Sequence, residues 1–401
     1  GRGRGVRFGR RGCRVRGLPV FYGELPAVCL AEEIETPGDG QVRALLTIAG
    51  NPVVSNPDSQ RLDAALATLD FMVSVDIYRN ETTRHANVIL PPERELARGH
   101  YDLALYSLAI RNVANYSPPI VEAAEHEMPE WQVLLRLAAI VAGQGADADV
   151  DALDDFVVAD VVHKAVGRGG SNVEGRNAEE LLGVLASRRG PERVLDFMLR
   201  TGPYGDGFGV NPDGLSLAVL EANPHGIDLG PLAPRVPDML RTPTGKIELA
   251  PEPIVADVER LRASLHTANG NGRLRLVGRR DLRSNNSWMH NVEVLVKGKP
   301  RCTVHVHPDD ALVAGLSDGA PTRVWSAAGE IVLPAEVTDA VMPGVVSIPH
   351  GWGHDVEGVD MRVASAYAGA NSNVLAGTID FDPLSGNAVL NGIAVDIAPA
   401  G

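Results

Sequence analysis

A short basic segment near residue 280 carries the clearest chemical signal in this sequence. Five arginines and one aspartate lie between Arg273 and Arg283, within a chain whose formal net charge is −14. A strand that leads into glycine, arginine and small polar residues offers guanidinium and backbone N–H groups to an anion, most naturally a pyrophosphate. A solvated loop with surface arginines is the alternative, and the neighbouring Ser-Asn-Asn-Ser cluster favours anion binding. The candidate residues are Gly278, Arg279, Arg280, Arg283, Ser284, Asn285, Asn286, Ser287 and His290.

Three predicted strands and a helix in the first hundred residues must position a second group of polar residues. Apolar runs and their bounding turns predict strands over Val42–Ile48 (a buried strand), Phe71–Asp76 and Asn87–Leu90. After the first strand, Asn56 has the pattern of a helix cap, with Pro57 at the first helical position. Strand, helix and strand at these spacings predict a βαβ unit with a parallel sheet. The apolar face of the helix consists of Leu62, Ala65, Leu66 and Leu69.

Polar residues follow two of these strands, where ligands bind in parallel sheets. They are Gly50, Asn51, Asp76 and the loop Asn80-Glu81-Thr82-Thr83. Asp76 could accept N–H groups of a guanine or hydroxyls of a ribose, and capping of the following turn is equally compatible with its position. The Gly50-Asn51-Pro52 turn could likewise be a ligand site or an ordinary turn, because no glycine-rich dinucleotide fingerprint or Walker lysine lies nearby.

Three other polar clusters give weaker signals. His305 and His307 alternate along a predicted strand, but a metal site needs a third ligand, so surface or core positions are favoured. The loop His350–His354 could line a pocket through its glycines, or could be a plain loop. Asn371–Asn373 could contact a heterocycle or make turns. The sequence has no Ser–His–Asp pattern, HExxH motif or nucleophile elbow.

The remaining pattern predicts a mixed α/β chain with several parts. Residues 128–200 have helical periodicity, and residues 201–252 are rich in glycine and proline and are expected to be irregular. From about residue 273, short strands and one helix that begins at Pro308 predict a small closed barrel. The expected parts are a disordered Arg/Gly tail over residues 1–17, a partial αβα domain over 18–150, a helical and irregular connecting region over 151–270, and the barrel over 271–401.

Composition excludes several classes of protein. The chain has 401 residues, with 44% hydrophobic and 22% charged residues, and no apolar run is long enough to span a bilayer. Cys13, Cys29 and Cys302 lie far apart without a CxxC pair, which excludes a disulfide framework or an iron–sulfur cluster within this chain and favours a cytoplasmic setting. The acidic net charge argues against a nucleic-acid partner, and we expect no membrane insertion.

Taken in order, these segments resemble the C-terminal portion of a molybdopterin oxidoreductase of the dimethyl sulfoxide reductase, formate dehydrogenase and nitrate reductase superfamily. The most specific match is Asn80-Glu81-Thr82 with the downstream Val88-Ile89-Leu90-Pro91. The resemblance covers about residues 18–398. Its other segments are Ala49–Ser55, Val73–Arg79, Thr244–Leu249, Gly278–Asn291, His307–Ala311, Pro343–Val346, Asn373–Leu375 and Asp382–Gly386.

The resemblance implies a fold, a cofactor and roles for the matched residues. The αβα domain, through Gly50, Asn51, Ser55, Asp76 and Asn80–Thr82, would hold a guanine dinucleotide tail, with Asp76 as the guanine acceptor. The C-terminal domain would be a double-psi β-barrel in which residues 279–290 wrap pterin and pyrophosphate. The implied cofactor is molybdopterin guanine dinucleotide with molybdenum, and the implied partners are a small-molecule substrate and a redox partner. On the barrel side, the wall of the cofactor site would be completed by His350, Gly351 and Asn373.

The sequence also departs from the family pattern. Family members carry a cysteine-rich segment for a [4Fe–4S] cluster and an upstream molybdenum ligand, and neither can be placed here. We therefore expect a C-terminal fragment of a longer enzyme, with the [4Fe–4S] cluster confined to the upstream part. The leading hypothesis is a molybdenum enzyme that performs two-electron or oxo-transfer chemistry on a small substrate, formate being one example. The alternative is a metal-free structural or electron-transfer assembly subunit, as the related large subunit of bacterial complex I is.

Overall fold

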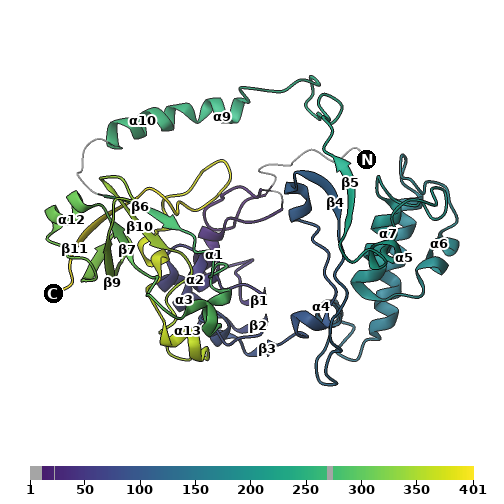
Figure 1. Ribbon diagram of the computed structural model, residues 1–401, viewed down its shortest axis with the longest axis horizontal. Helices are drawn as coiled ribbons and strands as arrows, with labels where there is room; N and C mark the ends of the chain where they lie inside the picture. Colours follow the sequence, from purple (N-terminus) through teal and green to yellow (C-terminus); the bar gives the residue numbers. More distant parts are fainter. Residues whose placement is uncertain (1–10, 22, 269–273) are drawn as a thin grey trace. The chain divides into compact units, whose positions relative to one another are not determined.

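The computed structural model describes residues 11–21, 23–268 and 274–401, which divide into two compact units (Figure 1). Of the described residues, 91–246 form one unit, and those from 11 to 90 together with those from 247 to 401 form the other. This division differs from the boundaries expected after residues 150 and 270, since residues 91–150 belong with the helical region.

The first sheet is parallel and has three strands, as the βαβ pattern predicted. Strands β1 (Ala44–Ile48), β2 (Phe71–Val75) and β3 (Val88–Leu90) lie in the order β1-β2-β3. Helices α1 (Leu30–Glu35) and α3 (Ser59–Leu66) pack together through a core cluster that includes Ile34, Leu62 and Leu66. The strand expected to be buried, β1, is instead open on one face, where Leu46 and Ile48 are nearly half exposed.

The predicted helix start at Asn56 and Pro57 was wrong. A short helix, α2 (Pro52–Ser55), begins directly after the turn with Pro52 at its first position, and Asn56 ends it by donating its N–H to the carbonyl of Pro52. Helix α3 follows Asp58, whose backbone is left-handed (φ 51°) and whose N–H donates to the carbonyl of Ala376. A contact with a segment distant in sequence thus sets the second helix start.

The C-terminal strands form a closed six-stranded barrel, which confirms the predicted barrel (Figure 1). Its order is β10-β6-β11-β8-β9-β7, with β6 parallel to β10 and β7 parallel to β9. Valine and isoleucine side chains that are fully buried fill its interior, as expected for alternating inward positions. The strands are β6 (Leu274–Arg279), β7 (Val304–Val306), β8 (Pro321–Trp325), β9 (Glu330–Val337), β10 (Val345–Pro349) and β11 (Ile393–Pro399).

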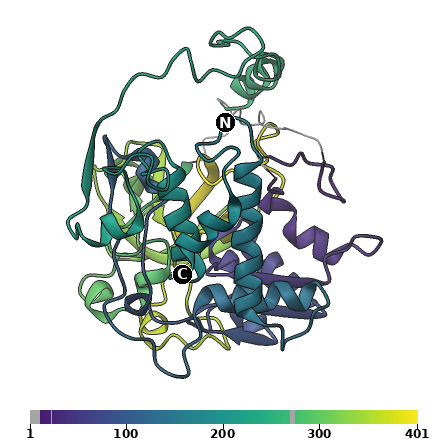
Figure 2. The ribbon, with the colours of Figure 1, turned by 90° about the vertical axis from the view of Figure 1, so that its right-hand side faces the viewer.

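The unit formed by residues 91–246 is mainly helical, as predicted for residues 128–200. Its helices cluster in both views (Figures 1 and 2), and Val158, Val162, Leu181 and Leu185 share one buried core. The antiparallel pair of β4 (Arg111–Ala114) and β5 (Ile227–Pro231) was not predicted, and β5 falls in the stretch expected to be irregular. The helices are α4 (Glu130–Val141), α5 (Val150–Val166), α6 (Ala178–Leu185), α7 (Gly190–Thr201) and α8 (Leu217–Glu221).

Short helices occupy the remaining segments. The 3-10 helices are η1 (Ala27–Cys29), η2 (Thr83–His85), η3 (Glu95–Ala97), η4 (Leu105–Leu108), η5 (Trp288–Asn291) and η6 (Ser372–Leu375). The α-helices are α9 (Glu252–Ala256), α10 (Val258–Ala268), α11 (Glu293–Val296), α12 (Pro308–Ala314) and α13 (Arg362–Ala366). Helix α12 begins at Pro308, as predicted. Among the described residues, every helix is too short or too polar to cross a bilayer.

The start of the described chain is folded rather than disordered. Arg14 bonds to Glu33 and to the carbonyl of Thr36, Arg16 pairs with Glu32, and Cys13 is buried. The expected disordered tail is therefore wrong for residues 11–17, because ion pairs to the acidic helix α1 hold the arginines. Residues 1–10 lie outside the described residues.

Candidate functional site

The loops that follow β6 and β10 meet at one end of the barrel. Because these two strands are parallel neighbours, their carboxyl ends share one edge, which brings residues 280–291 and 350–354 together. A cavity of about 300 Å³ opens there, at the lower end of the size range of ligand pockets. Its glycine and polar lining includes Gly278, Arg280, His350, Ser372, Asn373 and Asn391.

Arg279 lines the same cavity but directs its guanidinium into the barrel wall. Its N–H groups donate to the carbonyls of Ser347 (2.8 Å), Thr303 (3.0 Å) and Arg301 (3.3 Å). Burial lowers the pKa of Arg279, although the nearby carboxylate of Glu336 opposes that shift. The side chain therefore ties β6 to β10 and to the segment before β7.

Arg280 and Arg283, unlike Arg279, are exposed. Arg280 is bonded to the amide oxygen of Asn286. The positive charge of Arg280 also acts on His350, whose pKa is lowered first by burial and second by that charge. His350 is therefore a neutral ring near pH 7, able to donate from one nitrogen and to accept at the other.

The loops pack so closely that one position requires glycine. Asn285 and Asn286 are left-handed, with φ of 41° and 61°, and Gly351 has φ of 89°. A Cβ on Gly351 would lie 2.4 Å from the carbonyl oxygen of Asn286. In the same loop, Ser284 is buried and its hydroxyl donates to the carbonyl of Asp281. Ser287 directly precedes η5 and is half-buried. The predicted Ser-Asn-Asn-Ser cluster thus shapes the loop.

A buried array of hydrogen bonds joins the first sheet to the barrel. Glu81 Oε1 lies 2.8 Å from His354 Nδ1, and His354 Nε2 lies 2.8 Å from His290 Nδ1. The other carboxylate oxygen of Glu81 accepts the amide of Asn51 at 2.7 Å. All three members of the array, Glu81, His354 and His290, are at most 1% exposed.

The protonation states of this array follow from its geometry. Burial alone would raise the pKa of Glu81, but hydrogen bonds from His354 and Asn51 and the charge of His354 lower it overall. An ionised Glu81 only accepts, so His354 Nδ1 carries a proton. Burial, followed by the charge of His354, lowers the pKa of His290 to about 3, which keeps that ring neutral.

Two buried polar atoms beside this array have no hydrogen-bond partner among the residues that the structure describes. They are Nε2 of His290 and Nε1 of Trp352, whose rings stack with centroids 3.9 Å apart. Buried polar groups are nearly always paired, so orphaned atoms on a ring stack point to a polar group that is not part of the chain. These residues fit a bound polar heterocycle.

The residues at the ends of β1 and β2 mostly bond to one another. Asp76 accepts the backbone N–H of Tyr78 and the amide of Asn80, an arrangement that caps the following turn. Burial raises the pKa of Asp76, and these hydrogen bonds oppose the shift. Asn80 also accepts the N–H of Thr82, whose hydroxyl donates to Asn51. The turn-capping alternative for Asp76 is the one that the geometry displays.

The turn before Asn51 uses an unexpected residue. The left-handed position is Ala49 (φ 50°), whereas an added Cβ on Gly50 would make only ordinary contact. The exposed hydroxyl of Ser55 donates to the carbonyl of Asn51. Asn373, in the barrel, donates its amide to the carbonyl of Val54 at 2.6 Å. Asn373 therefore both lines the cavity and fastens it to helix α2.

Several residues of this region were not among the predicted site residues. His354 and Trp352 lie in the glycine-rich loop that the sequence singled out, but only their contacts reveal what they do. Asn391, which accepts the N–H of Gly278, had no sequence signal. His305 and His307, considered as metal ligands, instead contact Glu336 and cap helix α12.

Comparison with known proteins finds a family match over the barrel. The family described as "Molydopterin dinucleotide binding domain" matches residues 274–394. The assimilatory nitrate reductase catalytic subunit of Bacillus subtilis (strain 168) is 32% identical over 129 residues, covering 31% of this chain and 17% of that protein. The dimethyl sulfoxide/trimethylamine N-oxide reductase of Rhodobacter capsulatus is 24% identical over 338 residues, covering 78% and 36%.

A solved structure shares the fold. Acetylene hydratase from Pelobacter acetylenicus superposes with a TM-score of 0.56 and 20% identity, covering 94% of this chain and 47% of that one. The chain spans less than two fifths of the length of the two curated relatives. The domain match and the relatives support molybdopterin guanine dinucleotide with molybdenum as the cofactor. Residues 274–394 therefore match a molybdopterin dinucleotide-binding domain, and the chain is similar to enzymes of the molybdopterin oxidoreductase superfamily.

Proposed function

We propose that this chain supplies cofactor-binding walls of a molybdenum-dependent oxidoreductase that acts on a small substrate. The observation that carries the proposal is the buried array Glu81–His354–His290, which ends on an unpartnered ring nitrogen within the dinucleotide-binding domain. When bound, molybdopterin guanine dinucleotide supplies two-electron or oxo-transfer chemistry at molybdenum.

In this proposal, the array fixes the hydrogen-bond role of the unpartnered nitrogen of His290. The carboxylate of Glu81 accepts the hydrogen on Nδ1 of His354, so Nε2 of His354 is the acceptor for Nδ1–H of His290. Nε2 of His290 is then left as an acceptor toward a bound polar group.

Other residues would hold the dinucleotide. Arg280 and Arg283 are exposed and would neutralise phosphate, whereas the donors of Arg279 are directed at backbone carbonyls. His350 and Asn391 would offer polar atoms from the cavity wall. Asp76 retains lone pairs beyond its two turn contacts and would accept guanine N–H groups.

The finer parts of the proposal concern topology, substrate and partner. We propose that the barrel has double-psi topology, in keeping with its parallel pairs β6–β10 and β7–β9. We also propose a cytoplasmic protein, a small substrate such as formate, and a separate redox partner. Turnover of formate, nitrate and a sulfoxide with dye acceptors would distinguish these substrates in the protein that contains this chain.

The test of cofactor binding does not depend on turnover. The purified chain would be incubated with molybdopterin guanine dinucleotide released from a loaded enzyme, passed through gel filtration, and assayed for retained pterin by fluorescence after oxidation. We expect retention by the wild type and a loss of about tenfold or more in His290→Ala, since one hydrogen bond is worth about 0.5–1.5 kcal/mol and the stack is lost as well. His305→Ala, in the same barrel but outside the cavity, is the matched control. Equal retention in all three proteins, or none in the wild type, would refute the proposal.

A further inference from the structure

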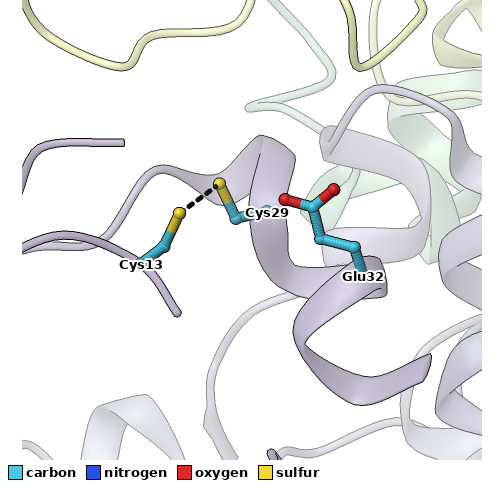
Figure 3. Close-up of side chains that lie close together, drawn as sticks. All are labelled: Cys13, Cys29 and Glu32. Carbon is cyan, nitrogen blue, oxygen red and sulfur yellow. Dashed lines mark hydrogen bonds between the residues drawn. The ribbon is translucent and has the colours of Figure 1, made fainter. Parts of the chain in front are cut away.

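Two of the three cysteines lie together near the start of the described chain. The sulfur atoms of Cys13 and Cys29 lie 3.2 Å apart, and both side chains are buried. Figure 3 shows them pointing toward one another, Cys13 from the segment before α1 and Cys29 from the start of that helix. Sixteen positions separate them in the sequence, without a motif that would pair them.

Independent contacts hold both sides of this pair in place. Cys13 packs in a cluster with Leu18, Val28 and Phe381, and its sulfur accepts the N–H of Leu18 at 3.2 Å. Arg16 donates to Glu32 and to the carbonyls of Val28 and Thr378. Arg16 therefore ties the segment that contains Cys13 to the residues around Cys29 by bonds that do not involve the thiols. The proximity of the sulfurs is a property of the local fold.

The surroundings favour a covalent bond between the sulfurs over a metal site. A carboxylate oxygen of Glu32 lies within 4.8 Å of both sulfurs, so three ligand atoms are available. However, the carboxylate of Glu32 is already bonded to the guanidinium of Arg16 at 2.5 Å, and that positive charge opposes a cation.

The pKa of Cys29 also argues against a metal site. Burial, the hydrogen bond to Cys13, and the charges of Cys13 and Glu32 raise the pKa of Cys29, with Arg16 opposing them. Cys29 is therefore a thiol, whereas a metal needs thiolates. A disulfide places no charge in this buried position.

We propose that Cys13 and Cys29 form a reversible disulfide that fastens residues 11–20 to the start of helix α1. The oxidant is a low-molecular-weight disulfide. A thiolate of one cysteine attacks it, expelling one small thiolate and leaving a mixed disulfide; the second cysteine then attacks the protein sulfur and displaces the other small thiolate. One small S–S bond and two protein S–H bonds are replaced by one protein S–S bond and two small S–H bonds.

The crosslink would stiffen one part of the dinucleotide-binding unit. Through Arg16 and Phe381, residues 11–20 contact the loop 378–388, which belongs mostly to the domain matched over residues 274–394. Closing a loop of this length changes the unfolding equilibrium by roughly a hundredfold in favour of the native chain. Because both side chains are buried and the pKa of Cys29 is raised, formation of the disulfide is slow and requires local opening.

The test is a thiol titration of the whole chain. The protein would be equilibrated in glutathione buffers of graded redox ratio, quenched in acid, denatured, alkylated with iodoacetamide and digested with trypsin. In oxidising buffer we expect a peptide of residues 12–14 linked to one of residues 17–43, with the intact mass reduced by two hydrogen atoms. Cys302, which is buried and distant from the pair, should be alkylated throughout and serves as the internal control.

Variants separate the crosslink from other effects of oxidation. Oxidation should raise the thermal unfolding temperature of the wild type and of Cys302→Ser reversibly, but not that of Cys13→Ser or Cys29→Ser. If Cys13 and Cys29 stay as reactive as Cys302 at every redox ratio, or carry only glutathione adducts, the proposal is refuted. The same is true if the temperature shift survives in Cys13→Ser. The wild-type peptide measurement decides the question even if a serine variant fails to fold.

Discussion

Replacing His290 with glutamine should flatten the dependence of barrel stability on pH. Burial and the neighbouring His354 lower the pKa of His290 to about 3 in the native chain, whereas an unfolded histidine titrates near ~6.5. Below that pH, His290 is protonated in the unfolded chain but stays unprotonated in the native chain. The stability due to a neutral His290 is therefore fully present above pH ~6.5 and is lost as the pH falls toward 3.

The size of the effect follows from the two pKa values. Each pH unit between them costs about 1.4 kcal/mol for one proton, so from pH 7 to pH 5 the wild type should lose about 2 kcal/mol through His290. Glutamine fills a similar space and can hydrogen-bond with His354, but it does not titrate. His290→Gln should be less stable than the wild type at pH 7 and should lose about 2 kcal/mol less on acidification.

Hydrogen exchange measures this locally, which matters because the chain has two units. The free energies of opening of amides in β6 and β10 would be compared at pH 7 and pH 5, after correction for intrinsic rates. His100→Gln, an exposed histidine of the other unit, is the control and should follow the wild type. Parallel pH profiles for wild type and His290→Gln would refute the assignment of a buried, neutral His290.

Three further predictions concern the same region. Glu81→Gln should reduce stability by about 2 kcal/mol at pH 7 in urea unfolding, because a charge-assisted bond to His354 is lost. Since the pKa of Glu81 is lowered in the native chain, the stability that its carboxylate contributes fades below pH ~4.3. The stabilities of the wild type and the variant should therefore converge in acid. Arg279→Ala should reduce stability by about 2 kcal/mol, since three carbonyls lose their donor. Arg280→Ala should instead keep stability and weaken binding of a fluorescent guanosine diphosphate several-fold. The reverse pattern would contradict a structural role for Arg279 and a phosphate-binding role for Arg280. Gly351→Ala should cost about 1–3 kcal/mol, through a left-handed backbone and a clash with the preceding loop, and an unchanged melting temperature would contradict the packing described.

Local patterns in the sequence predicted the elements of this protein well. The apolar runs at residues 42–48, 71–76 and 87–90 became parallel strands, because short β-branched segments between turn residues have few other ways to bury their side chains. The helix face of Leu62, Ala65 and Leu66 is buried as its period requires. The barrel followed from its many short strands. Each of these features depends on residues close in the chain.

One helix start depended on a residue distant in sequence. The sequence predicted a start at Asn56 and Pro57, whereas the structure begins α2 at Pro52 and α3 at Ser59. The N–H of Asp58, just before α3, donates to the carbonyl of Ala376, more than three hundred residues away. Strand β5 was missed for a similar reason, since its partner β4 lies over a hundred residues upstream.

The sequence by itself determined the element types, the parallel sheet, the barrel and the segments that build the site. Tertiary structure alone decided what their side chains do: Arg279 faces carbonyls rather than solvent, Glu81 meets His354 across 273 residues, and Cys13 meets Cys29. The physical reason is that backbone preference and hydrophobic period act over a few residues. A hydrogen bond between buried groups instead depends on which distant surfaces pack together, because only packing removes the water that would otherwise satisfy those groups.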